Sequence, residues 1–319
     1  MTFEIKILGS NSASFAFGRH HTAQLLNSNQ NLFLIDCGEA TQIQVLRHQV
    51  RYSRINHIFI SHLHGDHYLG LMGLIFTFHL QGRTEDLHVY GPKGLDEIIT
   101  IQLKYSDSRL NYTLHFNAIE GENQLLFENE DIEVRPIVMD HRIECFGFVF
   151  QEKQRKYKLN RDILPTTLSK ENLLDLKDGK DITDENGKFW QNALLATPPN
   201  EPRKYVYCAD TRFHPVIRPE VLNANLIYHE STFLNEMQIR AENTFHSTAQ
   251  EAGKFAALHN ARQLLIGHFS SRYHDVQPFL AEAKLEFENT ILAIEGQTFE
   301  VQPVQPIKIK LNKEEIVNH

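Results

Sequence analysis

The sequence predicts an α/β fold in which layers of strands and helices alternate. Three observations carry this prediction. Short apolar runs of strand length recur along the chain, stretches with helical spacing of apolar residues separate them, and polar residues with metal-binding chemistry stand just after several of the strands. Strands interleaved with helices are typical of sheets that are covered by helices. At 319 residues the chain can form one large domain or two modest ones.

The first half of the chain alternates predicted strands with predicted helices. Apolar residues at helical spacing, such as Ala40, Ile43 and Leu46, favour a helix. The dipeptide Gly91-Pro92 ends the strand that is expected at residues 87–90. The expected strands are residues 3–8, 23–26, 32–36, 57–60, 87–90, 132–138 and 146–151, and the expected helices are 39–49, 69–80 and 95–104.

The second half repeats this rhythm without a visible sequence repeat. We expect strands at residues 205–209, 226–230 and 263–267 and a helix at 247–259. Either Ser247 with Gln250 or Thr248 with Glu251 would form a capping box at the start of this helix.

A polar, charged stretch interrupts the pattern between the two halves. It holds the turn signals Asp178-Gly179 and Asn186-Gly187 and ends in Pro198-Pro199 and Pro202. We therefore expect residues 1–151 and 204–319 to form the main domain and residues 152–203 to be an inserted arm that projects from it.

The composition is that of an ordinary globular protein, with 41% apolar and 23% charged residues. No apolar stretch reaches the ~18 residues that a membrane span needs, so no membrane partner is expected. The cysteines Cys37, Cys145 and Cys208 stand singly without a CxxC pair. Sparse, unpaired cysteines indicate free thiols in a reducing compartment, which predicts a cytoplasmic protein.

The most informative segment follows the apolar run 58–60. His62, His64, Asp66 and His67 occur within six positions there. Imidazole and carboxylate together suit zinc or a similar ion. The cluster is too rich for one tetrahedral ion once distant ligands are added, so it indicates two metals and hydrolytic chemistry. A His-rich surface loop without function is the alternative in a chain with 18 histidines, but this spacing leaves the loop few other uses.

The motif His62-x-His64-x-Asp66-His67 resembles the signature of the metallo-β-lactamase superfamily. Further matches resemble ribonuclease Z, the endonuclease family that trims the 3′ trailer from precursor tRNA. They run in that family's order over nearly the whole chain, at residues 7–10, 36–42, 90–92, 209–212, 229–230, 245–248 and 268–273. The resemblance implies a four-layer αββα metallo-β-lactamase fold with a protruding arm, and a homodimer in which one subunit's arm holds tRNA while the other cuts.

The resemblance also implies the ligands of two Zn²⁺ ions per subunit. The first ion would be held by His62, His64 and His141, the second by Asp66, His67 and His268, and Asp210 would bridge them. Each of the three distant ligands stands at or just past the end of an expected strand, which agrees with sites that gather on one rim of a sheet. Two ions ~3.5–4 Å apart activate a water molecule and neutralise phosphate oxygens.

Three residues are candidates for catalysis. Asp66 would orient the attacking water in addition to its ligand role. His246 precedes the expected helix at 247–259, and Glu230 would keep it protonated, so that it donates a proton to the leaving oxygen. The alternative is a buried His–Glu pair that only supports the loop.

Candidate RNA contacts are basic residues outside the ligand set. A net charge of −8 argues mildly against a nucleic-acid partner, but the run 153–161 holds basic residues and no acid. The candidates are Arg19, Lys153, Arg155, Lys156, Lys158, Arg161 and Arg272. Arg272 and Tyr273 could equally lock the loop of His268. The arm carries the segment 168–174 where the family has a Gly-Pro-rich tip, and the loop before Arg19 lacks the family's proline.

The resemblance therefore implies a zinc-dependent endoribonuclease that leaves a 3′-hydroxyl on the tRNA and a 5′-phosphate on the trailer. A small-molecule phosphodiesterase or lactonase of the same fold would share the metal ligands. A non-catalytic RNA-binding member typically loses ligands, and all seven expected ones are present here.

Overall fold

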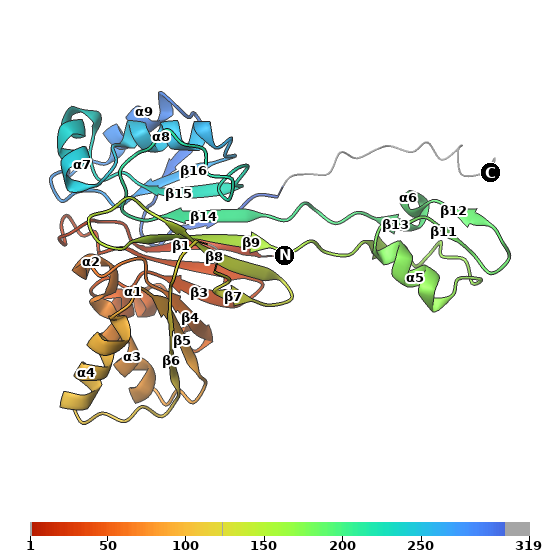
Figure 1. Ribbon diagram of the computed structural model, residues 1–319, viewed down its shortest axis with the longest axis horizontal. Coiled ribbons are helices and arrows are strands. Elements are labelled where there is room, and N and C mark those ends of the chain that lie inside the picture. Colours follow the sequence, from red (N-terminus) through yellow and green to blue (C-terminus); the bar gives the residue numbers. More distant parts are fainter. Residues whose placement is uncertain (1, 123, 304–319) are drawn as a thin grey trace. The chain divides into compact units, whose positions relative to one another are not determined.

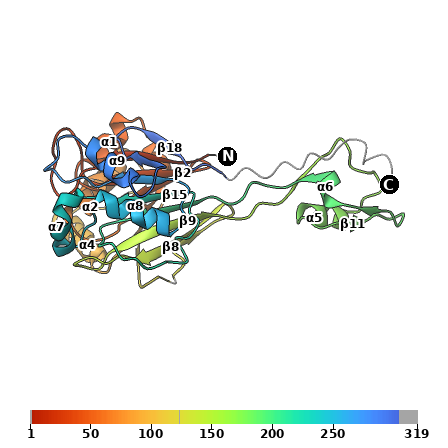
Figure 2. The same cartoon turned by 90° about the horizontal axis from the view of Figure 1, so that it is seen from above.

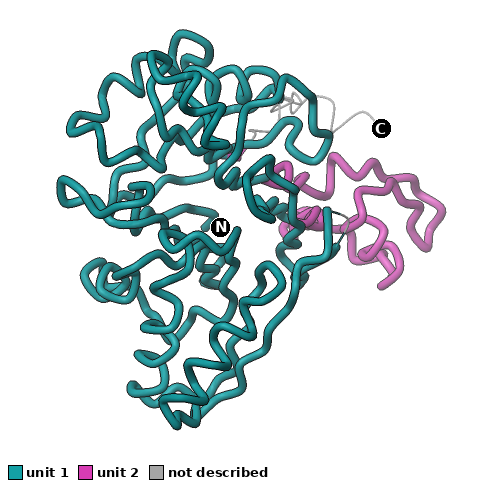
Figure 3. The backbone as a smooth tube through the Cα atoms, turned by 60° about the vertical axis from the view of Figure 1, so that its left-hand side comes forward, with its two compact units in different colours: residues 1–152, 204–302 teal, residues 153–203, 303–319 magenta. Residues whose placement is uncertain are grey.

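The computed structural model describes residues 2–122 and 124–303. The chain divides into two compact units, which Figure 3 colours separately. The first unit holds residues 1–152 and 204–302, and the second is built on residues 153–203. Within the described residues no helix is long and apolar enough to cross a membrane.

The first sheet of the larger unit combines an antiparallel meander with parallel strands. Its order is β18 (Thr298–Glu300), β1 (Phe3–Gly9), β2 (Ala23–Ser28), β3 (Asn31–Ile35), β4 (Ile55–Phe59), β5 (Leu87–Gly91) and β6 (Leu114–Ala118). Strands β3 to β6 run parallel, and parallel neighbours need long crossovers. The crossovers contain α1 (Thr41–Arg47), α2 (Gly65–Tyr68), α3 (Gly70–Leu80) and α4 (Leu95–Tyr105).

The second sheet has the same mixed character. Its order is β17 (Thr290–Leu292), β16 (Leu264–Gly267), β15 (Leu226–Glu230), β14 (Lys204–Cys208), β9 (Phe146–Glu152), β8 (Ile132–Val138) and β7 (Phe127–Glu128). Strands β14 to β17 run parallel, and β14, β9, β8 and β7 pair antiparallel. The helices α7 (Gln238–Thr244) and α8 (Ala249–Leu258) follow β15, and α9 (Gln277–Lys284) follows β16.

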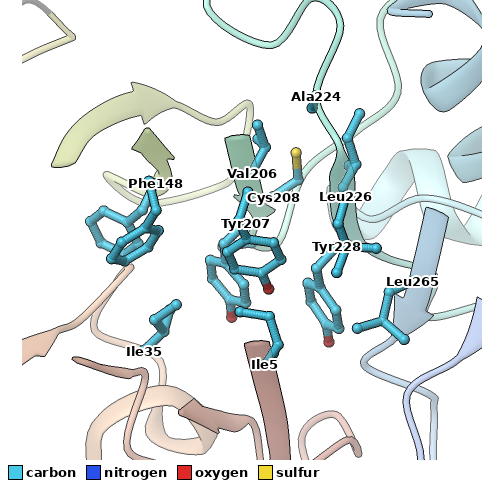
Figure 4. Packing of buried hydrophobic residues seen from close by; sticks show 14 of the residues in the cluster. Ile5, Ile35, Phe148, Val206, Tyr207, Cys208, Ala224, Leu226, Tyr228 and Leu265 are labelled. Carbon is cyan, nitrogen blue, oxygen red and sulfur yellow. The ribbon is translucent and has the colours of Figure 1, made fainter. Parts of the chain in front are cut away.

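The two sheets pack face to face, and helices cover their outer faces. Alternation along β3 shows why: Phe33 and Ile35 lie in the core between the sheets, whereas Leu32 and Leu34 pack with the helices on the other face. The result is the four-layer αββα arrangement of Figures 1 and 2. Figure 4 shows Ile5 and Ile35 of the first sheet facing Tyr207 and Tyr228 of the second. Each fully buried side chain of this size contributes about 1.5–3 kcal/mol.

The predicted fold class is confirmed, and the expected elements occur with small shifts at their ends. Helix α1 is shorter than the expected 39–49, because Ala40 and Gln49 adopt left-handed backbone angles (φ 67° and 53°) on either side of it. The second of the two possible capping boxes is present at α8, where Thr248 and Glu251 bond each other's backbone.

The second unit has a small core of its own. Its pairs of short strands are β10 (Lys158–Leu159) with β13 (Ala196–Thr197) and β11 (Ile182–Thr183) with β12 (Phe189–Trp190), and its helices are α5 (Lys170–Lys177) and α6 (Asn192–Leu195). Leu176, Ile182 and Leu195 are buried together. The unit is inserted between β9 and β14, whose ends pair at Gln151 and Lys204. Its role as a projecting, substrate-holding arm stays a prediction.

Candidate active site and metal centre

The seven expected metal ligands meet at one rim of the larger unit, where strands of both sheets end. His62 follows β4, His141 follows β8, Asp210 follows β14 and His268 follows β16. Because β4 and β14 to β16 each run toward this rim, residues distant in sequence become neighbours there. The rim holds a cavity of about 760 Å³ whose lining includes His64, Asp66, His141, Asp210, His246 and His268.

One group of donor atoms belongs to His62, His64, His141 and Asp210. Nδ1 of His64 lies 3.1 Å from Nε2 of His62 and 3.1 Å from Nε2 of His141. Oδ2 of Asp210 lies 3.5 Å from Nε2 of His62 and 3.9 Å from Nε2 of His141. Three ring nitrogens and a carboxylate oxygen thus surround one point.

A second group belongs to Asp66, His67 and His268. Nε2 of His67 and Nε2 of His268 are 3.2 Å apart, and they lie 3.7 and 3.4 Å from Oδ2 of Asp66. The other oxygen of Asp210, Oδ1, is 3.3 Å from His67 and 3.2 Å from His268. Asp210 therefore directs one oxygen to each group.

These distances fit tetrahedral metal coordination. Ligand atoms 2.0–2.1 Å from a zinc ion stand about 3.3–3.4 Å from one another at the corners of a regular tetrahedron. Oδ1 of Asp210 is buried and has no hydrogen-bond donor among the described residues. A buried carboxylate oxygen without a donor is costly unless a cation faces it. The donor set therefore fits metal binding at this rim.

A ring of hydrogen bonds on the far side of the histidines fixes their orientation. Nδ1 of His67 donates to Asp36 (2.8 Å), Nδ1 of His141 donates to the Phe245 carbonyl (2.9 Å), and Nδ1 of His268 donates to Oγ1 of Thr232 (2.9 Å). Each bond leaves Nε2 of the same ring free to face the centre. Partners of this kind hold ligand rings in place and raise their basicity.

Asp36 is the most connected of these partners and was not predicted as a site residue. Besides His67, it accepts hydrogen bonds from the amide and hydroxyl of Ser61 (2.7 and 2.9 Å) and from the hydroxyl of Tyr207 (2.6 Å). It is fully buried and has a left-handed backbone angle (φ 56°). Strained backbone of this kind persists where surrounding structure fixes it, and it is common at functional sites. In the sequence Asp36 opens the segment 36–42 that resembles the family, but nothing there shows its contacts with His67 and Tyr207.

Glu230, which is buried, and His246, which is partly buried, form a pair beside the second group. Nδ1 of His246 donates to Oε1 of Glu230 (3.0 Å), and Oε1 also accepts from the Ser247 amide (2.9 Å). Oε2 accepts from the amide and hydroxyl of Thr232 (2.9 and 2.7 Å). The same threonine oxygen accepts from His268, so one hydrogen-bond chain links Glu230 to the ligand group.

The charges of the pair reinforce each other. Burial lowers the pKa of His246, but the Glu230 and Asp210 carboxylates outweigh it and raise that pKa to about 9. Burial raises the pKa of Glu230, yet the charge and hydrogen bond of His246 lower it below its ordinary value. The arrangement favours an imidazolium next to a carboxylate at the edge of the cavity.

The ligand histidines divide by their surroundings. Burial, with neighbouring imidazoles, lowers the pKa of His62, and burial likewise lowers the pKa of His64 and of His141. Burial also lowers the pKa of His67, but the carboxylates of Asp210, Asp36 and Asp66 reverse that effect and raise it. Neutral imidazole is the form that binds metals, so the lowered pKa values of His62, His64 and His141 favour metal binding by the first group. At His67, a bound cation would replace the proton that the carboxylates favour.

The predicted RNA contacts fall into different places. Arg19 donates to Asn11 (2.9 Å) and to the carbonyls of Tyr273 (2.5 Å) and His274 (3.1 Å), so its guanidinium braces the loop before β2. Arg272 is exposed at the rim of the cavity. Lys153, Arg155, Lys156, Lys158 and Arg161 belong to the second unit, where Lys156 pairs with Asp178 at 3.0 Å. Contact of these residues with RNA stays a prediction.

Sequence reasoning missed two further arginines of the cavity. Arg142 lies 3.3 Å from Nε2 of His64, and Arg240 of α7, whose guanidinium is 5.9 Å from the centroid of the Phe233 ring, also lines the cavity. Together with Arg272 they place three guanidinium groups around a cavity whose wall holds only one acid, Glu39, outside the ligand set. A single arginine in a loop or helix carries no distinctive pattern, so only the fold could bring these together.

Comparisons with known proteins place this fold and site in a class. A family model described as anti-Pycsar protein Apyc1 matches residues 3–177. The metallo-β-lactamase fold protein YhfI from Bacillus subtilis superposes with a TM-score of 0.67 at 18% identity, covering 93% of this chain and 98% of that one. With its two facing sheets and the rim of histidines and aspartates, the molecule has a metallo-β-lactamase fold.

Two more similar proteins narrow the class. A relative named Ribonuclease Z from Cytophaga hutchinsonii is 47% identical over 305 residues, which is 94% of this chain and 97% of the relative. The human tRNase Z, short form, superposes with a TM-score of 0.67 at 25% identity and covers 94% of this chain and 99% of its own. The chain belongs to the ribonuclease Z family, as its motifs predicted.

Proposed function

We propose that this protein is a dinuclear zinc endoribonuclease that removes the 3′ trailer from precursor tRNA. The tRNA would keep a 3′-hydroxyl and the trailer a 5′-phosphate. One observation carries the proposal: two groups of metal-binding side chains lie on either side of Asp210, which directs one oxygen to each. The chain that holds them belongs to the ribonuclease Z family. The name of its relative states the ribonuclease activity, and the human structure's name states a tRNA substrate.

The proposed ligands divide between the two ions as the donor groups do. His62, His64 and His141 would hold one zinc ion and Asp66, His67 and His268 the other, with Asp210 contributing an oxygen to each. Two zinc ions bound in this way would activate water and neutralise the oxygens of the scissile phosphate.

The chain's own residues would position the reactants. Asp66, held by the Ala13 amide (2.7 Å), would accept a hydrogen bond from the attacking water and orient it. His246, held in its charged form by Glu230, would donate a proton to the leaving 3′-oxygen. Arg142, Arg240 and Arg272 would bind neighbouring phosphates along the cavity.

The assembly and location are part of the same proposal. The insertion at 153–203, with its five basic residues near the start, would grip the body of the tRNA from one subunit of a homodimer while the other subunit cuts. Ile43 and Leu46 of α1 and Leu69 are exposed apolar side chains that a partner subunit would cover. The buried free cysteines Cys37, Cys145 and Cys208 agree with a cytoplasmic enzyme.

A small-molecule phosphodiesterase or lactonase of the same fold is the rival. Such an enzyme would share all seven ligands, but the binding of a small substrate does not explain the second unit at residues 153–203. Relatives named Ribonuclease Z match 92–95% of the chain, which includes that unit, whereas the Apyc1 model ends at residue 177.

The decisive experiment is cleavage of a precursor tRNA with a 3′ trailer, with both products mapped to the nucleotide. We expect one cut at the junction of tRNA and trailer, with a 3′-hydroxyl on the upstream product. A simple ester such as bis(p-nitrophenyl) phosphate should be a far poorer substrate. Hydrolysis of the simple ester with an untouched precursor tRNA would contradict the proposal and favour the rival.

A further inference from the structure

A second cavity adjoins the catalytic one at His246. It has a volume of about 310 Å³ and is lined by Arg212, Phe213, His214, Gln238, Glu242, His246 and Glu251. His246 is the one residue that lines both cavities. The volume lies at the small end of ligand pockets, so the second cavity suits a single flat group rather than a strand.

The charges of this cavity favour an amino group over a phosphate, because its two cations, Arg212 and His246, each face a carboxylate already. The Arg212 guanidinium is already neutralised, because its Nε and one terminal nitrogen bond Asp140 at 2.8 and 3.2 Å. Glu242 and Glu251 add two carboxylates to the lining. An anion would meet repulsion from both, whereas an amino group would find acceptors.

One carboxylate of the cavity is free to accept hydrogen bonds. Glu251 is occupied by its capping box with Thr248 and by the amide of Gln238 at 3.1 Å. Glu242, on α7, is exposed, and among the described residues nothing donates a hydrogen bond to its carboxylate. Carboxylates recognise the exocyclic amino groups of nucleobases, as in the contact of Glu with cytosine N4.

The cavity also offers a flat surface. The guanidinium of Arg212 lies over the Phe245 ring with its centre 4.0 Å from the ring centroid. Its bonds to Asp140 hold the plane in place, and the side chain is one-third exposed and lines the cavity. Unpaired bases stack on arginine planes and aromatic rings in RNA-binding proteins.

We propose that this cavity binds the base of the last nucleotide that the tRNA retains, with Arg212 beneath the base and Glu242 accepting from its exocyclic amino group. The inference rests on the proposed function. His246 would protonate the 3′-oxygen of that nucleotide, and only the ribose separates this oxygen from the base. The base of that nucleotide would therefore lie close to His246, in the second cavity that His246 lines.

The test varies that nucleotide and Glu242 together. Precursor tRNAs would carry adenine, purine (adenine without its amino group) or no base at the last retained position. The enzymes would be the native protein, Glu242→Ala, and the matched control Glu236→Ala, which makes the same change on an exposed residue outside the cavity. Both variants alter exposed side chains, and thermal unfolding checks that they fold.

With the native enzyme and the control, kcat/KM should fall about tenfold from adenine to purine, since a hydrogen bond to a charged group is lost. It should fall further when the base is absent. With Glu242→Ala, whose side chain offers no acceptor, adenine and purine should be cleaved within about twofold of each other. An equal adenine-to-purine ratio in all three enzymes would overturn the inference while trailer cleavage stands. No cleavage of any precursor by the native enzyme would instead overturn the proposed function.

Discussion

At the scale of single residues, the site depends on side chains that have one fixed orientation. Asp210 is buried between two groups of ring nitrogens and directs one oxygen to each. Such a carboxylate is stable only when positive charge faces both oxygens, which the two proposed ions would provide. The ring orientations are set in turn by partners outside the ligand set, of which Asp36 is the most connected.

Replacing His246 should separate proton donation from metal binding. We expect His246→Ala to lower kcat on precursor tRNA about 10²- to 10³-fold, because a general acid contributes about this much. The metal content should stay at the native level, because His246 donates its Nδ1 hydrogen to Glu230 and lies outside both proposed ligand groups. Metal analysis and single-turnover cleavage measure the two effects. Full turnover in a metal-loaded His246→Ala enzyme would show that the Glu230–His246 pair only supports the loop and takes no part in catalysis.

Replacing Asp36 should weaken metal binding without removing a ligand. Asp36→Asn keeps the size of the side chain but no longer offers a charged acceptor to His67, so we expect metal affinity to fall about 10- to 100-fold. Zinc competition with a chelator measures this. Activity should return at high zinc concentration. Unchanged zinc affinity would show that the His67 ring is held by its other neighbours alone.

At the scale of elements, parallel strands bring the site together because their ends share one rim. His62, Asp210 and His268 each stand within a few residues of the end of a strand, which is why the sequence could nominate them. The motif His62-x-His64-x-Asp66-His67 is local and needed no knowledge of the fold. Asp36 also follows a strand and opens the family motif at 36–42, but its role could not be read there, because its contacts with His67 and Tyr207 span 31 and 171 residues.

The strand order was also beyond the sequence. Nothing local shows that β14 pairs with β9 on one side and β15 on the other, or that β18 joins the first sheet beside β1. Strands β6 and β17 were not predicted: the residues of β6 are at most partly buried, and β17 has only three residues, too few to show an alternating pattern. The arginines of the cavity rim come from three separate segments, so only these pairings make them neighbours.

Three histidines stack across neighbouring parallel strands of the first sheet and should make its stability depend on pH. His57 of β4, His88 of β5 and His115 of β6 are paired in register, with ring centroids 5.2 and 4.6 Å apart. Burial, with the charges of His88 and Arg83, lowers the pKa of His57 to about 4. An unfolded histidine has a pKa of about 6.5, so the unfolded chain binds the extra proton between these values.

Stability should therefore be lost as the pH falls from 6.5 toward 4, and His57 would account for at most about 3 kcal/mol of the loss. We expect His57→Phe, which keeps an aromatic ring, to lose less thermal stability than the native protein over this range. The matched control is His115→Phe at the exposed end of the row. Melting temperatures that fall in parallel for native and His57→Phe proteins would contradict this assignment.

At the scale of the whole molecule, the larger unit holds the proposed metal centre and the smaller one is proposed to carry part of the substrate binding. The register of β9 and β14 places Gln151 opposite Lys204, so a short turn can join the two strands directly. Replacing residues 153–203 with an Asn-Gly turn should leave metal content and hydrolysis of bis(p-nitrophenyl) phosphate unchanged. The KM for precursor tRNA should rise at least about tenfold, because phosphate contacts supply much of the affinity for nucleic acids.

A second variant separates charge from shape in this unit. The full chain with alanine at Lys153, Arg155, Lys156, Lys158 and Arg161 should show a weaker dependence of tRNA binding on salt, since fewer counterions are released. If both variants kept the native KM and the native salt dependence, residues 153–203 would have no role in tRNA binding.

The most direct test of the central claim is the metal content of the purified protein, measured with its activity on precursor tRNA while zinc is removed and restored. We predict two zinc ions per chain and loss of cleavage after chelation, with activity restored by zinc. Asp210→Ala should bind fewer than two ions and cleave at least about 10³-fold more slowly. Full cleavage by a chain with one ion or none, or by Asp210→Ala, would contradict the account.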